Sequence, residues 1–249
     1  MSFAHFIGEY LRRYISPATA EAPYPTRINF YRRIVMTPIN HQEYFHPRFL
    51  PDFVKPPKLL HYLASRNFAL TEGEIMDAQI KSIQAAVNGI ASGSRCLEIG
   101  FNCGLSAATI LSSRDDVSLV SVDIGEHPTV LLAKPIIDKV FPDRHTLIIG
   151  SSLDVVPRLG HAFNMQFDFL FIDGGHTHPV PYMDIVNCIK LAADAALICI
   201  DDWCEVFGAG GVNQAIAEFM GNGTLRCIEK NTAKGHLYDH GWGFFKINR

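Results

Sequence analysis

The sequence lacks a Cys-x-x-Cys pair, although it contains six cysteines: Cys96, Cys103, Cys188, Cys199, Cys204 and Cys227. Cysteines paired at that spacing are typical of zinc sites and redox centres, and a dense cysteine framework is typical of small secreted domains. Neither pattern fits a chain of 249 residues with scattered cysteines. We therefore expect reduced thiols and a cytoplasmic protein.

The N-terminus lacks a continuous apolar run, and the chain as a whole lacks a strong charge of one sign. Glu9, Arg12 and Arg13 interrupt the apolar stripe at the N-terminus, so we expect neither a signal peptide nor a membrane span. A formal net charge of −3 argues against nucleic acid as a partner. A hydrophobic content of 48% with 19% charged residues excludes a disordered chain.

The dinucleotide fingerprint Gly-x-Gly-x-x-Gly is also missing from the glycine-rich turn at residues 96–106. This segment reads Glu-x-Gly-x-x-x-Gly, and Asn102 stands where the second glycine of the fingerprint belongs, so a nicotinamide cofactor is disfavoured. Gly100 and Gly104 let a ligand approach the backbone closely, and the helix predicted after them directs free N–H groups at an anion. Two interpretations are open: a cofactor-binding turn, or a plain strand-to-helix turn.

Residues 1–70 and 71–249 differ in pattern. The first part begins with an amphipathic helix and continues as a segment rich in proline and aromatic residues, which we interpret as a lid or wrapping segment. This helix is expected to pack either on its own domain or on a second subunit, and the second arrangement would give a homodimer. The second part alternates between strand and helix patterns and is expected to hold the functional domain.

The alternation predicts a doubly wound, Rossmann-like α/β fold with a mostly parallel sheet. The expected strands are 95–99, 118–123, 145–149, 168–172 and 195–200, and the expected helices are 104–113, 128–140, 152–159, 179–192 and 211–220. Apolar runs at 224–229 and 242–247 have no helix between them, which predicts an antiparallel strand pair at the edge and a seven-stranded sheet in total.

Acidic residues stand at the ends of four predicted strands: Glu98, Asp123, Asp173 and the pair Asp201-Asp202. Ligands of doubly wound sheets bind at these strand ends, and an acid after the second strand can bind both ribose hydroxyls. Asp123 is therefore the expected nucleoside anchor. The alternative is a surface acid that caps the next helix.

Asp173, Asp201 and Asp202 would meet at one rim of the sheet. Three carboxylates at close range favour a divalent cation such as Mg²⁺, because their repulsion is otherwise uncompensated. The alternative is that some of them cap helices or pair with lysines. His176 follows Asp173 in a glycine-rich turn, and its pKa range suits a general base, although a lone histidine is more often structural.

Together these motifs resemble the class I S-adenosylmethionine-dependent methyltransferases, most closely the metal-dependent catechol O-methyltransferase type. The segments that carry the resemblance, in chain order, are Gly73–Ala78, Leu97–Ser106, Ile149–Pro157, Phe169–Asp173 and Ile200–Asp202. The resemblance covers about residues 71–203.

The resemblance implies S-adenosylmethionine as the cofactor and assigns roles to individual residues. Gly100 and Ser106 would hold the methionine end, Asp123 the ribose and Ser152 the adenine edge. The expected cofactor site as a whole comprises Glu98, Gly100, Asn102, Gly104, Ser106, Asp123, Ile124, Ser151, Ser152 and Asp173. Asp173, Asp201 and Asp202 would bind Mg²⁺.

The chain departs from the catechol enzymes at three positions. It has Asp202 where they have an amide metal ligand, His176 where they have a base lysine, and Gly175 where they have an aromatic residue that packs on the cofactor. Catechol is therefore not assigned as the substrate. The sequence favours metal-dependent methylation of a hydroxyl on a small molecule, with His176 as the base.

Three other functions are compatible with parts of the sequence. In the first, the methyltransferase works without a metal and His176 alone is the base. In the second, the chain binds S-adenosylmethionine but is catalytically inactive. A nicotinamide oxidoreductase is the weakest, because the glycine spacing is wrong for it.

Overall fold

The computed structural model describes residues 75–163, 165–204, 209–234 and 239–249. The expected domain boundary at residue 70 and the N-terminal helix and lid segment lie outside these residues. Within the described part, no helix is both long enough and apolar enough to cross a membrane.

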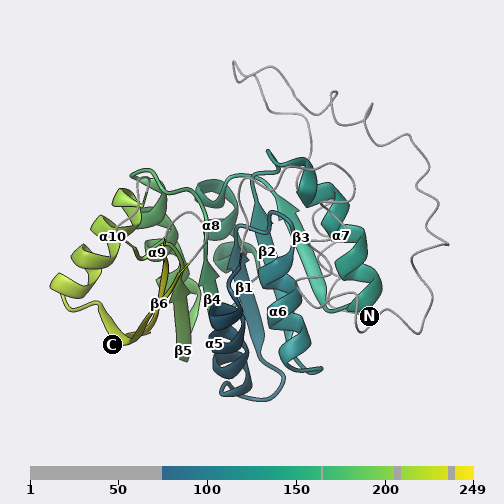
Figure 1. Cartoon of the computed structure of the whole chain (residues 1–249), viewed down its shortest axis with the longest axis horizontal. Coiled ribbons are helices and arrows are strands. Elements are labelled where there is room, and N and C mark those ends of the chain that lie inside the picture. The colour runs from purple at the N-terminus through teal and green to yellow at the C-terminus, as the bar shows by residue number, and fades with distance from the viewer. Residues whose placement is uncertain (1–74, 164, 205–208, 235–238) are drawn as a thin grey trace.

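A seven-stranded sheet in the order β3-β2-β1-β4-β5-β7-β6 forms the centre of the molecule (Figure 1). The strands are β1 Arg95–Ile99, β2 Ser118–Asp123, β3 His145–Ile149, β4 Phe167–Ile172, β5 Ala192–Ile200, β6 Leu225–Lys234 and β7 Asp239–Ile247. The first five are parallel, and β7 is antiparallel to both β5 and β6. The predicted fold is therefore confirmed.

Helices cover both faces of the sheet and enclose two hydrophobic cores. One core receives residues from α5 (Asp77–Asn88), α6 (Leu105–Ser113) and α7 (Pro128–Val140). The other receives residues from α8 (Ser152–Phe163), α9 (Val180–Leu191) and α10 (Gly210–Gly221). The result is a helix-sheet-helix sandwich (Figure 1).

The central strands are apolar on both sides because both faces of the sheet are covered. In β1, Leu97 and Ile99 enter the core beneath α8, α9 and α10, whereas Cys96 enters the opposite core. Side chains alternate along a strand, so Glu98 shares the face of Cys96, where it is fully buried. A buried acid in the middle of an apolar strand needs partners, and these are described with the site.

Several expected elements have other bounds in the structure: β5 begins at Ala192, β6 extends to Lys234 and β7 begins at Asp239. The C-terminal strand pair lies at the edge as expected, but β7 takes the inner position because its Trp242, Phe244 and Phe245 are buried. The helix expected to stop before Gly160 continues to Phe163. A Cβ at Gly160 would lie 2.7 Å from the side chain of Leu191, so this glycine permits close packing of α8 on α9 and does not end the helix.

Candidate active site

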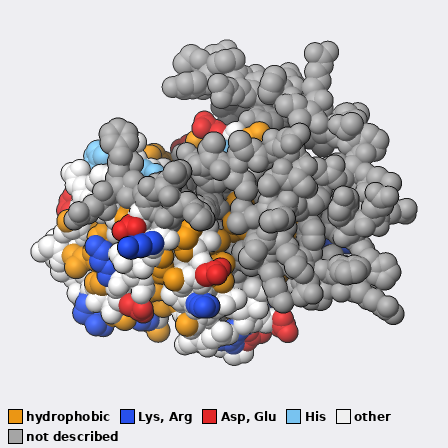
Figure 2. Space-filling model, in the orientation of Figure 1, with side chains coloured by type: hydrophobic (Ala, Val, Ile, Leu, Met, Phe, Trp, Pro, Cys, Tyr) orange, Lys and Arg blue, Asp and Glu red, His pale blue; other side chains and the backbone are white. Residues whose placement is uncertain are grey.

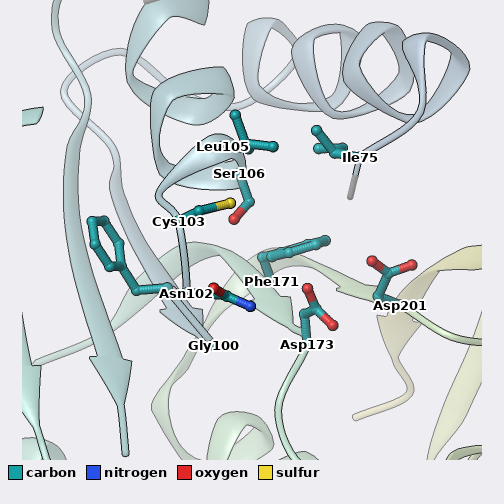
Figure 3. Close-up of a pocket in the computed structure, with 10 residues that line it drawn as sticks. Ile75, Gly100, Asn102, Cys103, Leu105, Ser106, Phe171, Asp173 and Asp201 are labelled. Atoms are coloured by element: carbon teal, nitrogen blue, oxygen red, sulfur yellow. The ribbon is translucent and has the colours of Figure 1, made fainter. Parts of the chain in front are cut away.

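The chain reverses its direction of travel across the sheet between β1 and β4, because β2 and β3 lie on one side of β1 and β4 on the other. Such a switch point is where doubly wound sheets bind ligands. The last residues of β1, β4 and β5 are paired across the sheet, so the three strands end at the same level. The residues that follow them, Gly100, Asp173 and Asp201, therefore lie along one edge (Figure 3).

The glycine turn after β1 packs directly against the end of β4. Gly100 has a left-handed φ of 91°, and a Cβ at this position would lie 1.8 Å from the carbonyl oxygen of Asp173. Gly104, also left-handed at φ 76°, is the N-cap residue of α6. The first amides of α6 therefore lie at the edge of the sheet, where they suit an anionic group.

Asp123, at the end of β2, fixes the glycine turn from the side. Its Oδ2 accepts hydrogen bonds from the backbone N–H groups of Phe101 (2.9 Å) and Asn102 (2.8 Å), and Oδ1 accepts one from Gly125 (2.7 Å). Asp123 is only 7% exposed, and His127 occupies the N-cap of α7. The alternative of a surface acid that caps this helix is therefore wrong. Oδ1 retains acceptor capacity for a ligand hydroxyl.

A cavity of about 20 Å³ lies at the glycine turn. Asn102, Ser106 and Cys103 line it from the turn and from α6, and Asp173 and Asp201 line it from the neighbouring strand ends (Figure 3). Burial raises the pKa of the Cys103 thiol to about 11, so this side chain is a neutral wall at physiological pH.

The remaining expected cofactor residues follow β2 and β3, one and two strands further along the same edge. Ile124 follows β2 and is 58% exposed. Ser151 and Ser152 follow β3 at the start of α8, and none of these three lines the cavity.

The side chain of Asn102, which does line the cavity, is fixed by the Thr129 hydroxyl, which donates a hydrogen bond to its Oδ1 at 2.8 Å.

Glu98 lies beneath the turn in a buried polar network. The Ser121 hydroxyl donates to its Oε2 and lies 3.0 Å from Nε2 of His145, whose ring stacks on Phe101 of the turn. Oε1 of Glu98 has no hydrogen-bond partner among the described residues. Burial raises the pKa of Glu98 to about 7, although the Ser106 and Ser121 hydroxyls oppose the rise. Glu98 therefore supports the turn from below and does not line the cavity.

This pKa predicts that stability falls as the pH rises. Glu98 holds its proton more tightly in the folded protein than in the unfolded chain. Its contribution to the free energy of unfolding is therefore fully present below about pH 4.5 and is lost as the pH rises through about 7. The loss is about 3 kcal/mol, because each pKa unit corresponds to about 1.4 kcal/mol. We expect Glu98→Gln to remove this part of the pH dependence. Urea unfolding of both proteins at pH 4.5 and pH 8 measures it, and parallel profiles would contradict the assignment.

A second group of side chains lies next to the turn. Asp173, His176 and Asp202 each offer a ligand atom, and these atoms all lie within 4.8 Å of one another. Nε2 of His176 lies 2.7 Å from Oδ2 of Asp202. Asp202 has a left-handed φ of 57°, an unusual backbone conformation for a residue with a side chain and one that clusters at functional sites.

Asp201, expected as the third acid of the metal site, is placed differently. Its Oδ2 accepts a hydrogen bond from the Gln79 side chain at 2.7 Å, and its Oδ1 accepts one from the backbone N–H of Asp202 at 2.9 Å. Burial, followed by the charge of Asp202, raises its pKa. The structure thus places His176, expected as the base, beside Asp173 and Asp202 in a group that could hold a metal ion, called the metal-ligating group below. Asp201 is hydrogen-bonded to α5 instead.

Sequence reasoning missed two polar residues at this edge, Gln79 on α5 and Asp184 on α9. Both are buried, with exposed fractions of 1% and 0%. The available signal was an acid on an apolar helix face: Asp184 is flanked at helical spacing by the buried residues Pro181 and Cys188.

The fold and the site together resemble a class I methyltransferase domain, in which a glycine turn after the first strand faces acids that follow the fourth and fifth strands. A family model described as a methyltransferase domain matches residues 97–203. This match spans the glycine turn, Asp123 and the group of Asp173, His176 and Asp202. Over these residues the chain is therefore similar to a methyltransferase domain.

One curated relative is similar in sequence, the O-methyltransferase imqG of Aspergillus flavus. It is 24% identical over 129 residues, which is 50% of this chain and 50% of that protein. The chain thus spans about half the length of the curated relative that it matches.

Several solved structures share the fold. The O-methyltransferase of Bacillus cereus, solved in complex with SAH, is 17% identical and has a TM-score of 0.66, with 90% of this chain and 98% of that chain covered. The Streptomyces achromogenes O-methyltransferase TomG, solved with SAM, is 16% identical and has a TM-score of 0.63, with coverage of 89% and 96%. These likenesses show that the chain has the fold of these O-methyltransferases.

Proposed function

We propose that this protein transfers the methyl group of S-adenosylmethionine to a hydroxyl of a small molecule, with a divalent cation held by Asp173, His176 and Asp202. One observation carries the proposal: Asp173 lines the cavity at the glycine turn and also belongs to the metal-ligating group. A cofactor on one side of this residue and an acceptor on the other would be adjacent, as in-line displacement requires.

The cofactor would lie along the edge from β1 to β3. The backbone of the glycine turn and the Ser106 hydroxyl suit the charged methionine end, and Oδ1 of Asp123 suits a ribose hydroxyl. The residues proposed for the whole site are Gly100, Asn102, Gly104, Ser106, Asp123, Ile124, Ser151, Ser152 and Asp173, with Glu98 as support from below. S-adenosylmethionine, when bound, supplies an electrophilic methyl group.

The ligand atoms in the metal-ligating group fit a divalent cation. Two carboxylates suit Mg²⁺, and the imidazole of His176 also admits transition metals such as Mn²⁺. Such an ion would compensate the negative charges of the two acids, which otherwise repel each other at close range. A cation held there would lower the pKa of an acceptor hydroxyl.

One observation favours a second function, methyl transfer without a metal. Asp202 Oδ2 lies 2.7 Å from Nε2 of His176, and a carboxylate at that distance stabilises the charged form of the imidazole. In this arrangement His176 accepts the proton of the acceptor hydroxyl and Asp202 compensates its charge.

A small molecule is the proposed acceptor. The net charge is only −3, and Lys, Arg, Asp and Glu side chains are interspersed on the part of the surface in Figure 2 that belongs to described residues. Such a surface offers no extended basic track of the kind that a nucleic-acid backbone needs. The homodimer and the cytoplasmic location stay predictions.

The experiment that tests the metal is methyl transfer from labelled S-adenosylmethionine to a panel of hydroxylated small molecules, with and without EDTA. We expect EDTA to lower the rate by more than about 100-fold, because the cation's effect on the acceptor hydroxyl amounts to several kcal/mol. Added Mg²⁺ or Mn²⁺ should restore it. A full rate in excess EDTA, lost in His176→Ala, would establish the metal-free function instead. Cofactor binding with no turnover of any acceptor would point to an inactive binding module.

A further inference from the structure

Asp184, on the buried side of α9, has no role in the site described so far. It is 0% exposed, and neither carboxylate oxygen has a hydrogen-bond partner among the described residues. Burial raises its pKa to about 6, and the nearby Ser152 hydroxyl opposes the rise without forming a hydrogen bond. Buried polar groups in proteins are almost always satisfied, so an isolated carboxylate of this kind indicates a missing donor.

A second cavity connects Asp184 to the metal-ligating group. Its volume is about 10 Å³, and Asp173, His176, Asp202 and Asp184 all line it. A cavity of that size has room for about one water molecule, and the carboxylates and the imidazole that line it offer polar partners. The missing donor is therefore no larger than a water molecule.

The turn that carries Asp173 and His176 is shaped to admit the carboxylate. A Cβ at Gly174 would lie 2.9 Å from Oδ2 of Asp184, so a side chain at this position would push the carboxylate away. Yet Asp184 is not among the residues whose ligand atoms lie within 4.8 Å of one another. Its carboxylate lies against Gly174 of the turn but does not belong to the metal-ligating group.

We propose that Asp184 is a positioning residue that binds the metal-ligating group of Asp173, His176 and Asp202 through one buried water molecule and thereby strengthens its hold on a divalent cation. The water molecule has two O–H donors, and Asp184 accepts a hydrogen bond from one of them. The oxygen of the water remains available on the side of the cavity where the proposed cation lies. Groups behind the ligands of a metal orient those ligands and add charge that favours the cation. This inference rests on the proposed metal site.

The test is Mn²⁺ binding to the full chain, followed by electron paramagnetic resonance and calorimetry. Asp184→Asn keeps the size of the side chain and removes its charge, and we expect it to weaken Mn²⁺ binding by about 10- to 100-fold. The affinity for SAH should stay unchanged. In the absence of metal the variant should be at least as stable as the natural protein, because a buried isolated carboxylate is removed. A merely structural role would lower stability instead.

Asn187→Leu is the matched control, because Asn187 is buried on the same helix with an unpaired Nδ2 but does not line the cavity. It should bind Mn²⁺ as the natural protein does. An Mn²⁺ affinity of Asp184→Asn within twofold of that of the natural protein would overturn this inference but leave the proposed metal site intact. Weakened SAH binding with normal Mn²⁺ binding would overturn it in favour of a nucleoside contact. Failure of the natural protein to bind Mn²⁺ would remove the proposed metal site itself.

Discussion

Replacement of Gly100 by alanine is expected to abolish cofactor binding. The left-handed conformation of this residue costs an L-amino acid about 1–2 kcal/mol, and the added Cβ would lie 1.8 Å from the carbonyl oxygen of Asp173. The turn and the end of β4 must then separate, which opens the cavity between them. We expect the affinity for SAH to fall by more than about 100-fold, equivalent to about 3 kcal/mol, in isothermal titration calorimetry.

Gly223→Ala is the control for this prediction. Gly223 has a similar left-handed φ of 78°, but a Cβ there would meet nothing within 4 Å. This variant should lose about 1–2 kcal/mol of folding stability and bind SAH normally. If Gly100→Ala binds SAH as well as Gly223→Ala does, the glycine turn is not the cofactor site.

The second large effect is expected from neutralising the acids of the metal-ligating group. Asp173→Asn and Asp202→Asn each keep the shape of the side chain but remove a charge that the proposed cation needs. We expect methyl transfer to fall by more than about 100-fold in each variant and Mn²⁺ binding to weaken with it. The affinity for SAH should change little in Asp202→Asn, because Asp202 does not line the cavity at the glycine turn.

Asp154→Asn serves as the control, since Asp154 is an exposed acid on α8 outside both cavities. It removes the same charge and should leave both methyl transfer and Mn²⁺ binding unchanged. Rates of Asp173→Asn and Asp202→Asn that equal the rate of Asp154→Asn would contradict the proposed role of the acids.

The parallel half of the sheet could be predicted closely from the sequence because its signals are local. Compact apolar runs between charged and glycine-containing turns predict β1, β2 and β3 with the bounds that the structure has. The position of β7 between β5 and β6 could not be predicted in this way, since strand order among the last elements depends on contacts between distant segments. Gly160 likewise reads as a helix stop until the packing partner Leu191 is known.

The candidate site was also predictable only where its signals are local in the sequence. The glycine turn and the acids after the strands could be located from the sequence, because parallel strands end at a common edge. Which acids belong to the proposed metal-ligating group could not be predicted, because this depends on the left-handed backbone of Asp202 and on Gln79, a residue of α5 that donates a hydrogen bond to Asp201. Asp184 was missed because the turn and the cavity that it faces are assembled only in the folded chain.

The most direct test of the central claim is calorimetric titration of the natural protein with SAH in the presence of Mg²⁺. The account predicts one-to-one binding with a Kd on the order of micromolar, and no detectable binding to Gly100→Ala at the same concentrations. Absence of binding of both SAH and S-adenosylmethionine to the folded natural protein would contradict a methyltransferase cofactor site at the glycine turn.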